Sequence, residues 1–178
     1  IHTDVANSST LPQDEYLLAI RREDEGQGGS LYLHNKVNSG DVLTIREPTN
    51  DFPLNENDDN IILLAGGIGV TPIAAMASEL FLKGKKFEFH YSCRSQDQVA
   101  FEDELRTLLG DKLHMHLDDS ANALDLKALL GSHEKNRPIY ICGPKGMIDA
   151  TFDIAKGLGW NDASLHSELF TAAGPVEG

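Results

Sequence analysis

The sequence predicts an α/β protein whose larger part, residues 56–178, is a doubly wound parallel sheet of five strands. Two observations predict this fold class. Short apolar segments alternate with segments of helical periodicity, which is typical of βαβ units whose sheet is covered on both faces. The chain of 178 residues, with 40% hydrophobic and 24% charged residues, also has the length and composition of a globular protein with a sizeable core.

The elements of this sheet follow one another regularly from residue 60. The first strand, NIILLAG, is almost continuously apolar, as expected of a strand buried on both faces. Glycines mark the ends of the first two helices, at Gly84 and Gly110. The predicted strands are residues 60–66, 86–94, 112–119, 137–144 and 163–170, and the predicted helices are residues 72–84, 98–110, 125–133 and 145–159.

The part before this sheet reads differently. Residues 16–22 and 42–48 are short, aliphatic and β-branched, which predicts two strands. Between them, glycines precede Ser30, a candidate N-cap for about two turns of helix that end near Gly40. The polar, proline-bearing segment 48–60 then predicts a domain boundary near residue 56, dividing the chain into residues 1–55 and 56–178.

Charge and cysteine content exclude several classes of function. The formal charge of −13 argues against nucleic acid or an anionic membrane as the main partner, since both select basic surfaces. It suits docking to a basic protein, although a solubilising surface would look the same. The two cysteines lie far apart, so neither a disulfide framework nor a CxxC site is expected. Without a membrane-length apolar run or a signal peptide, the expected compartment is the cytoplasm.

The turn after the first strand is the first candidate binding element. Gly66, Gly67 and Gly69 follow a strand and precede a helix, so a phosphate-bearing ligand could approach the backbone. Pro72 occupies the third glycine position of a GxGxxG fingerprint. Thr71 and Pro72 are instead interpreted as the N-cap and first residue of the helix. A tight turn without a ligand is an equally good reading of the glycines alone.

Other strand ends carry polar or reactive residues. Arg94 and Ser95 could meet a phosphate or adenine, whereas a solvated loop arginine is the simpler reading. Cys142 at a buried strand end lacks an evident base, so thiol catalysis is not expected. Asp118 could reach a ribose, or could simply begin the next turn. His114 and His116 share one strand face but have no apparent third ligand, so solvated histidines are predicted and no metal site.

Four motifs in one order resemble a known family. AGGIGVTPI, HYSCRS, CGPKGMIDA and LHSELF occur with the order and spacing of the ferredoxin–NADP reductase superfamily. The chain is most similar to its phthalate dioxygenase reductase branch, which includes vanillate demethylase-type reductases. The segment EGQGGSLYLHNKVNSGDVLTIREPTNDFPL resembles the later part of that branch's flavin-binding barrel. The resemblance therefore implies that residues 1–55 are a fragment of a Greek-key β-barrel.

The resemblance implies roles for individual residues. It places the catalytic contacts to flavin and nicotinamide at Thr71, Cys142 and Glu168. It assigns cofactor binding to Gly29, Ser30, Gly67, Gly69, Thr71, Pro72, Arg94, Ser95, Asp118, Cys142, Gly143, Pro144 and Phe170. Within this set, Gly29 and Ser30 would receive the FMN phosphate at a helix N-terminus, and Phe170 would stack on the isoalloxazine ring.

The implied activity is that of a reductase component of a Rieske-type oxygenase system. Hydride would pass from NADH to FMN, and single electrons would then reach an iron–sulfur centre. NADPH is left open by Arg94. The terminal oxygenase or a ferredoxin domain would be the protein partner.

Two departures from the family pattern shape further expectations. Residues 1–4 stand where the family has an Arg-x-Tyr-Ser motif, and two cysteines cannot hold a [2Fe–2S] cluster. We therefore expect a partial chain that lacks the first half of the barrel and the cluster domain. We also expect it to bind the dinucleotide better than the flavin. A non-catalytic NAD-binding module and an acidic docking domain are the alternative functions.

Overall fold

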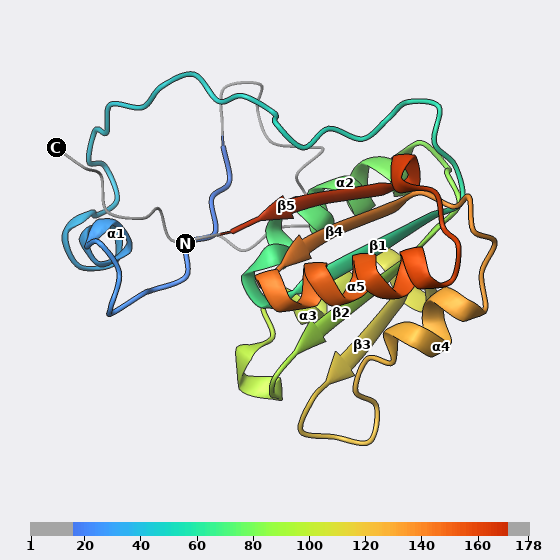
Figure 1. Ribbon diagram of the computed structural model, residues 1–178. Helices are drawn as coiled ribbons and strands as arrows, with labels where there is room; N and C mark the ends of the chain where they lie inside the picture. Colours follow the sequence, from blue (N-terminus) through green and yellow to red (C-terminus); the bar gives the residue numbers. More distant parts are fainter. Residues whose placement is uncertain (1–15, 171–178) are drawn as a thin grey trace, which may run out of the picture.

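The computed structural model describes residues 16–170 and confirms the predicted α/β sheet (Figure 1). Five parallel strands form one sheet in the order β3-β2-β1-β4-β5. The strands are β1 (Ile61–Gly66), β2 (Phe87–Cys93), β3 (Leu113–Leu117), β4 (Ile139–Gly143) and β5 (Leu165–Leu169). The helices are α1 (Gly29–Lys36), α2 (Val70–Leu82), α3 (Glu102–Leu109), α4 (Leu126–Gly131) and α5 (Lys145–Gly157).

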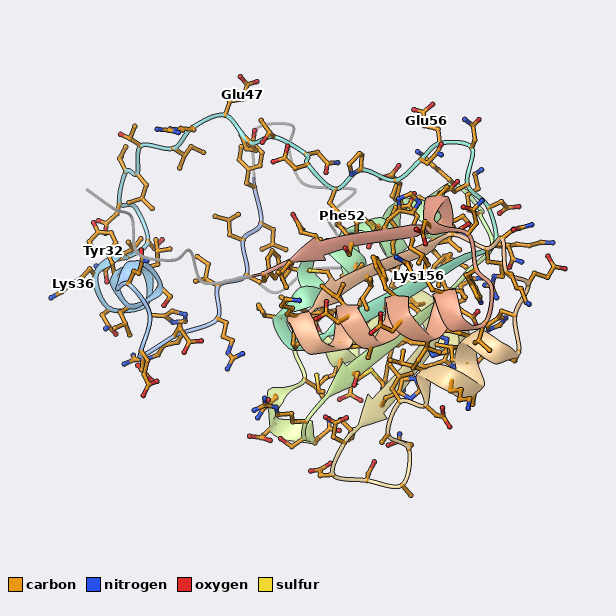
Figure 2. All side chains as sticks on the ribbon, in the orientation of Figure 1. Tyr32, Lys36, Glu47, Phe52, Glu56 and Lys156 are labelled. Carbon is orange, nitrogen blue, oxygen red and sulfur yellow. The ribbon has the colours of Figure 1, made fainter. Side chains whose placement is uncertain are left out.

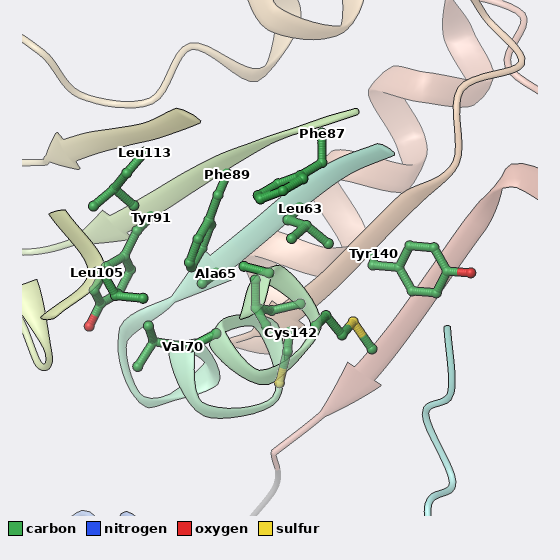
Figure 3. Packing of buried hydrophobic residues seen from close by; sticks show 14 of the residues in the cluster. Leu63, Ala65, Val70, Phe87, Phe89, Tyr91, Leu105, Leu113, Tyr140 and Cys142 are labelled. Atoms are coloured by element: carbon green, nitrogen blue, oxygen red, sulfur yellow. The ribbon is translucent and has the colours of Figure 1, made fainter. Parts of the chain in front are cut away.

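The central strand β1 shows why the sheet is covered on both faces. All six of its residues are buried. Because side chains alternate along a strand, Leu63 packs in one cluster with residues of α2 and α3 (Figure 3), and Leu64 packs in a second with residues of α4 and α5. None of the helices within residues 16–170 is long and apolar enough to cross a bilayer.

The strand order creates a point where the chain changes direction within the sheet. From β1 the chain moves outward through β2 to β3, then returns to β4 on the other side of β1. The carboxyl ends of β1 and β4 are therefore neighbours whose following loops diverge to opposite faces (Figure 1). In open α/β sheets this switch point is where ligands bind.

The strands predicted at residues 16–22 and 42–48 are wrong, because neither segment is a strand in the structure. A strand requires a hydrogen-bonded neighbour, and no segment within residues 16–170 pairs with either of them. Their apolar side chains are instead exposed, with Leu18 at 69% and Val42 at 94%. Residues 1–4, compared above with the Arg-x-Tyr-Ser motif, lie outside the described residues, and the barrel assignment stays a prediction.

Helix α1 is confirmed but begins differently from the prediction. Its N-cap is Gly28, whose φ of 90° favours glycine, and not Ser30. The Ser30 hydroxyl accepts a hydrogen bond from the Glu23 amide at 3.0 Å, and it donates one to the Glu23 carbonyl. Ser30 thus ties the preceding loop to α1, and the helix ends at Lys36 rather than near Gly40.

The segment before β1 is attached to the sheet through Tyr140. Figure 2 places Phe52 against the sheet, with its ring centroid 5.8 Å from that of Tyr140. The Tyr140 hydroxyl donates to a carboxylate oxygen of Asp58 at 2.7 Å and accepts from the amide of Asn55 at 3.0 Å. These contacts bring the end of the polar segment to the sheet.

Replacing Tyr140 with phenylalanine should lower the free energy of unfolding at neutral pH. It should also reduce the loss of stability that the wild-type chain shows above about pH 10. The variant leaves the Asn55 amide without its acceptor, at a cost of about 1–2 kcal/mol. Burial and the bond to Asp58 raise the pKa of Tyr140 to about 12. The unfolded tyrosine ionises near pH 10. The contribution of Tyr140 to stability is therefore complete below about pH 10 and falls as the pH rises from 10 to about 12.

Urea unfolding between pH 7 and 11.5 measures both effects. The difference in stability between the wild-type chain and Tyr140→Phe should shrink above pH 10. Tyr32→Phe is the control because Tyr32 is 55% exposed. Parallel curves for wild type and Tyr140→Phe would contradict the assignment.

Candidate functional site

The loops after β1 and β4 touch through their backbones at the switch point. A Cβ atom at Gly69 would lie 2.2 Å from the Cys142 carbonyl oxygen. A Cβ atom at Gly66 would lie 2.7 Å from both Pro144 Cδ and Met147 Sδ. Gly66 and Gly69 are therefore required for the two loops to approach each other. The sequence prediction had assigned these glycines to the approach of a ligand.

Gly67 differs from its neighbouring glycines. Its φ of +53° is in the left-handed region, and a Cβ atom built there would meet nothing within 4 Å. Gly67 thus has open space beside its backbone, which a ligand could approach closely. It also lines a cavity at the carboxyl ends of the strands.

This cavity has a volume of about 320 Å³ and lies within the size range of small-molecule sites. It is lined by Arg21, Gly66, Gly67, Ser92, Cys93, Arg94, Gln98, Asp118, Leu124, Leu126, Pro144 and Met147. Four of these residues are predicted site residues: Gly67, Arg94, Asp118 and Pro144. They follow β1, β2, β3 and β4, respectively. The Arg94 and Asp118 side chains are exposed, so both charges are accessible to a ligand.

The remaining predicted residues do not line this cavity. The Ser95 hydroxyl donates to a carboxylate oxygen of Asp97 at 2.5 Å, so it is engaged within its own loop. Gly69 and Gly143 lie in the contact between the two loops. The first residues of α1, Gly29 and Ser30, belong to the segment before the sheet.

Thr71 is not the N-cap of α2, contrary to the prediction. The helix begins at Val70, directly after the short 3₁₀ turn η2 (Gly67–Gly69), and Gly69 occupies the cap position. The Thr71 hydroxyl donates to the Ile68 carbonyl at 3.2 Å. Pro72 is therefore the third helical residue, where its missing amide still costs no intrahelical hydrogen bond.

Cys142 lies fully buried at the carboxyl end of β4, among the side chains of Figure 3. Burial, with a smaller contribution from the charge of Glu168, raises the pKa of the Cys142 thiol to about 12. The thiol is thus protonated at neutral pH, which agrees with the expectation that it is not a nucleophile.

Glu168 and Phe170 lie at the carboxyl end of the sheet beside β4. Glu168 is opposite Cys142 in the β4–β5 register and is partly buried. Phe170 directly follows β5 and is 45% exposed. Its exposed ring offers an apolar surface that a planar ligand could cover.

Several residues of the cavity wall were not predicted from the sequence, and Arg21 and Met147 are two examples. Arg21 comes from the segment before α1, and only the folded chain brings it to the cavity. Met147 lies in the first turn of α5, two residues after the helix begins. Because Met147 closely follows the predicted turn at Gly143 and Pro144, its place near the cavity could have been predicted. Nothing in the sequence around Arg21 indicated contact with the sheet.

A second cavity, of about 560 Å³, lies along β4 and β5. It is lined by residues 51–55 and by Tyr140, Leu165, His166 and Ser167. This cavity lies beside Tyr140 near the start of β4 and the first three residues of β5, and it holds none of the predicted binding residues. The strand-end cavity is therefore the better candidate for the site.

The prediction that His114 and His116 are solvated histidines is only partly right. His114 is exposed, but His116 Nε2 lies 3.0 Å from His90 Nδ1, and the His90 side chain is buried. Burial lowers the pKa of both His114 and His116. Glu88, on the same face, contacts His90, His133 and Arg137.

The Glu88 carboxylate is ionised within this group. Burial opposes its charge, but the contacts with His90, Arg137 and His133 outweigh burial and lower the pKa of Glu88 to about 2. The shortest of these contacts joins Glu88 Oε1 to an Arg137 nitrogen at 2.7 Å.

Comparison with known proteins shows the family to which the sheet belongs. The oxidoreductase NAD-binding domain model matches residues 63–153, which include the loops after β1, β2, β3 and β4. The carnitine monooxygenase reductase subunit of Acinetobacter pittii is 37% identical over 96% of this chain and 56% of its own length. The vanillate O-demethylase oxidoreductase of a Pseudomonas strain is 38% identical over 90% of this chain and 52% of its own.

A solved structure supports the same relationship. Phthalate dioxygenase reductase superposes with a TM-score of 0.77 and 31% identity, over 88% of this chain and 49% of that protein. The chain thus spans about half the length of the relatives it matches. From the sheet order, the glycine-lined switch point and these matches, the chain belongs to the oxidoreductase NAD-binding domain family, within the ferredoxin reductase-like superfamily.

Proposed function

We propose that this chain is the nicotinamide-binding part of an electron-transfer reductase that oxidises NADH. The observation that carries the proposal is the strand-end cavity, where Gly67, Arg94 and Asp118 meet at the switch point. A dinucleotide needs a close backbone approach, a cation for phosphate and an acceptor for ribose hydroxyls. The cavity brings these three features together.

One charge in the cavity, that of Asp118, favours NADH over NADPH. Arg94 and Arg21 supply guanidinium groups that suit phosphate oxygens. Asp118 supplies a carboxylate that accepts hydrogen bonds from ribose hydroxyls and repels a 2′-phosphate. Thr71, Cys142 and Glu168 are proposed to place the nicotinamide. With its thiol protonated, Cys142 contributes shape rather than charge.

The described residues fit part of an FMN site. Amides of the first turn of α1, at Gly29 and Ser30, suit the phosphate, and no acidic residue lies in that turn. The exposed ring of Phe170 suits the isoalloxazine. When bound, FMN would supply conversion of a two-electron hydride into single electrons. The protein's part is to align the two rings and exclude water.

The chain does not itself fit an iron–sulfur cluster. It has two cysteines, and both Cys93 and Cys142 are buried in the sheet domain, whereas a [2Fe–2S] cluster takes four ligands. We propose that electrons pass to a cluster in a ferredoxin domain or in a Rieske-type oxygenase. The relatives support this because their names describe reductase components of monooxygenase and demethylase systems.

Calorimetric titration of the chain with NADH tests the binding site. Arg94→Ala should weaken binding about tenfold, because it removes a charge-assisted hydrogen bond to phosphate. Arg46→Ala is the matched control, since Arg46 is exposed and does not line the cavity. Equal affinities for the two variants would exclude Arg94 from the site, and no heat from NADH with any variant would overturn the proposal.

Visible absorption then separates the reductase from its alternative. A chain that turns yellow with FMN and bleaches on anaerobic addition of NADH acts as a reductase. A chain that binds NADH but stays colourless after FMN is added is a non-catalytic NAD-binding module. The absence of paired strands at residues 16–22 and 42–48 of the described chain is the observation that keeps this alternative in view.

A further inference from the structure

A group of potential metal ligands lies on the sheet, separate from the residues that line the strand-end cavity. Glu88 and His90 are alternate residues of β2 and therefore share one face of the sheet. His114 is directly opposite His90 on the neighbouring strand β3. The donor atoms of these three side chains all lie within 4.8 Å of one another.

Hydrogen bonds behind His90 determine which of its nitrogens is free. The Asn122 carbonyl can only accept, so His116 Nδ1, 3.1 Å away, must be the donor. Neutral His116 is then an acceptor at Nε2, which accepts a hydrogen bond from the Nδ1–H group of His90 at 3.0 Å. A neutral His90 consequently directs the bare lone pair of Nε2 away from His116, toward Glu88.

With His90 neutral, the two atoms that face each other there are both acceptors, whereas a protonated His90 would pair with Glu88. His90 Nε2 lies 3.5 Å from Glu88 Oε2, is buried and has no hydrogen-bond partner. The His90 residue is only 6% exposed, so water does not solvate it freely. A buried lone pair opposite a carboxylate is costly unless a cation lies between them.

We propose that Glu88, His90 and His114 form a binding site for a divalent transition metal, for which zinc is the best candidate. Two imidazoles and one carboxylate are a common zinc ligand set that leaves the fourth position open. Ligand atoms at about 2.0–2.1 Å from zinc lie about 3.3 Å apart in a tetrahedron. The exposed ring of His114 closes that difference by rotating, since it now stacks on His90 with centroids 4.7 Å apart.

The surrounding groups hold the ligands in place. The His116–Asn122 relay fixes the His90 ring, as second-shell partners do in metal sites. Glu88 Oε1 lies within ion-pair distance of Arg137 at 2.7 Å and of His133 at 3.0 Å without a hydrogen bond to either, and Oε2 faces His90 and is left for the metal. The positive charge of Arg137 near the ion weakens binding, so we expect micromolar rather than picomolar affinity.

Titration of the metal-free chain with zinc chloride tests the site. We expect one equivalent to bind, and His114→Asn should weaken binding at least about tenfold. His114 is exposed, so this variant keeps the fold. His34→Asn is the matched control, because His34 is an exposed histidine that contacts the Ile20 carbonyl outside the group.

Nitrogen-15 NMR of the histidine rings gives a readout that does not depend on affinity alone. Zinc should shift the Nε2 resonance of His90 while Nδ1 keeps its proton. Binding equal in His114→Asn and His34→Asn would overturn the proposal. So would a His90 ring that carries protons on both nitrogens and does not respond to zinc, since an ion pair with Glu88 would then occupy the position.

Discussion

Replacing Gly69 with alanine should destabilise the protein by about 3 kcal/mol or more and abolish NADH binding. The added Cβ would lie 2.2 Å from the Cys142 carbonyl oxygen and 2.8 Å from the Gly143 nitrogen. Both are main-chain atoms, so no rotamer change relieves the overlap. The loops after β1 and β4 must separate, which opens the wall of the strand-end cavity. Urea denaturation and calorimetry with NADH measure the two effects.

The same substitution at Gly146 is the control. Gly146 lies in the first turn of α5, and a Cβ atom there meets nothing within 4 Å. Alanine should leave stability unchanged or raise it by up to about 1 kcal/mol, because it is the better helix former. The backbone φ of Gly69 is −60°, which alanine adopts readily, so the destabilisation by Gly69→Ala is steric and not conformational. Equal stability of the two variants would disprove the loop contact.

Replacing Arg137 with methionine should cost about 3–5 kcal/mol, because it leaves a partly buried carboxylate without its closest cation. Arg137 is 8% exposed and lies 2.7 Å from Glu88 Oε1. Its Nε also donates to the Asn60 carbonyl at 2.6 Å, just before β1 begins. Methionine fills the volume but satisfies neither group. Thermal and urea unfolding in the presence of a chelator measure the loss without contribution from a bound metal.

The matched control is Arg106→Met. Arg106 forms an exposed ion pair with Glu102 at 2.8 Å on α3, and such pairs contribute about 0.3–0.5 kcal/mol. The double variant Arg137→Met with Glu88→Met should recover much of the loss, because both charges are then gone. If the double variant were as unstable as the sum of the single variants, the ion pair would not explain the effect.

The sheet could be predicted from the sequence because each strand carries its own signal. The apolar run of β1 predicts a strand buried on both faces, and the alternation of polar and aromatic residues in β2 predicts a strand with two different faces. The observed bounds of these two strands differ from the predicted ones by one residue at most. Residues 16–22 and 42–48 have the same local preference for strand. They nevertheless form none, because a strand depends on a partner that local preference cannot supply.

The candidate site was predictable to the extent that topology determines it. Parallel strands place their carboxyl ends together, so Gly67, Arg94 and Asp118 meet around one cavity. The approach of Arg21 and the backbone contact at Gly69 depend on distances between loops, which sequence spacing does not encode. In β2, the polar residues Glu88 and His90 alternate with aromatic ones, so the sequence alone indicates that both side chains lie on one face of the strand.

The contact between the loops after β1 and β4 has a consequence for how this protein can change. A Cβ atom at Gly143 would come within 3.1 Å of the Gly66 backbone, so the spacing of the two loops is set by main-chain atoms. Arg94 and Asp118 come from loops outside that contact. In the proposed site, natural or laboratory evolution can therefore exchange these two charges without altering the contact between the loops, and the preference for NADH or NADPH would change with the charges.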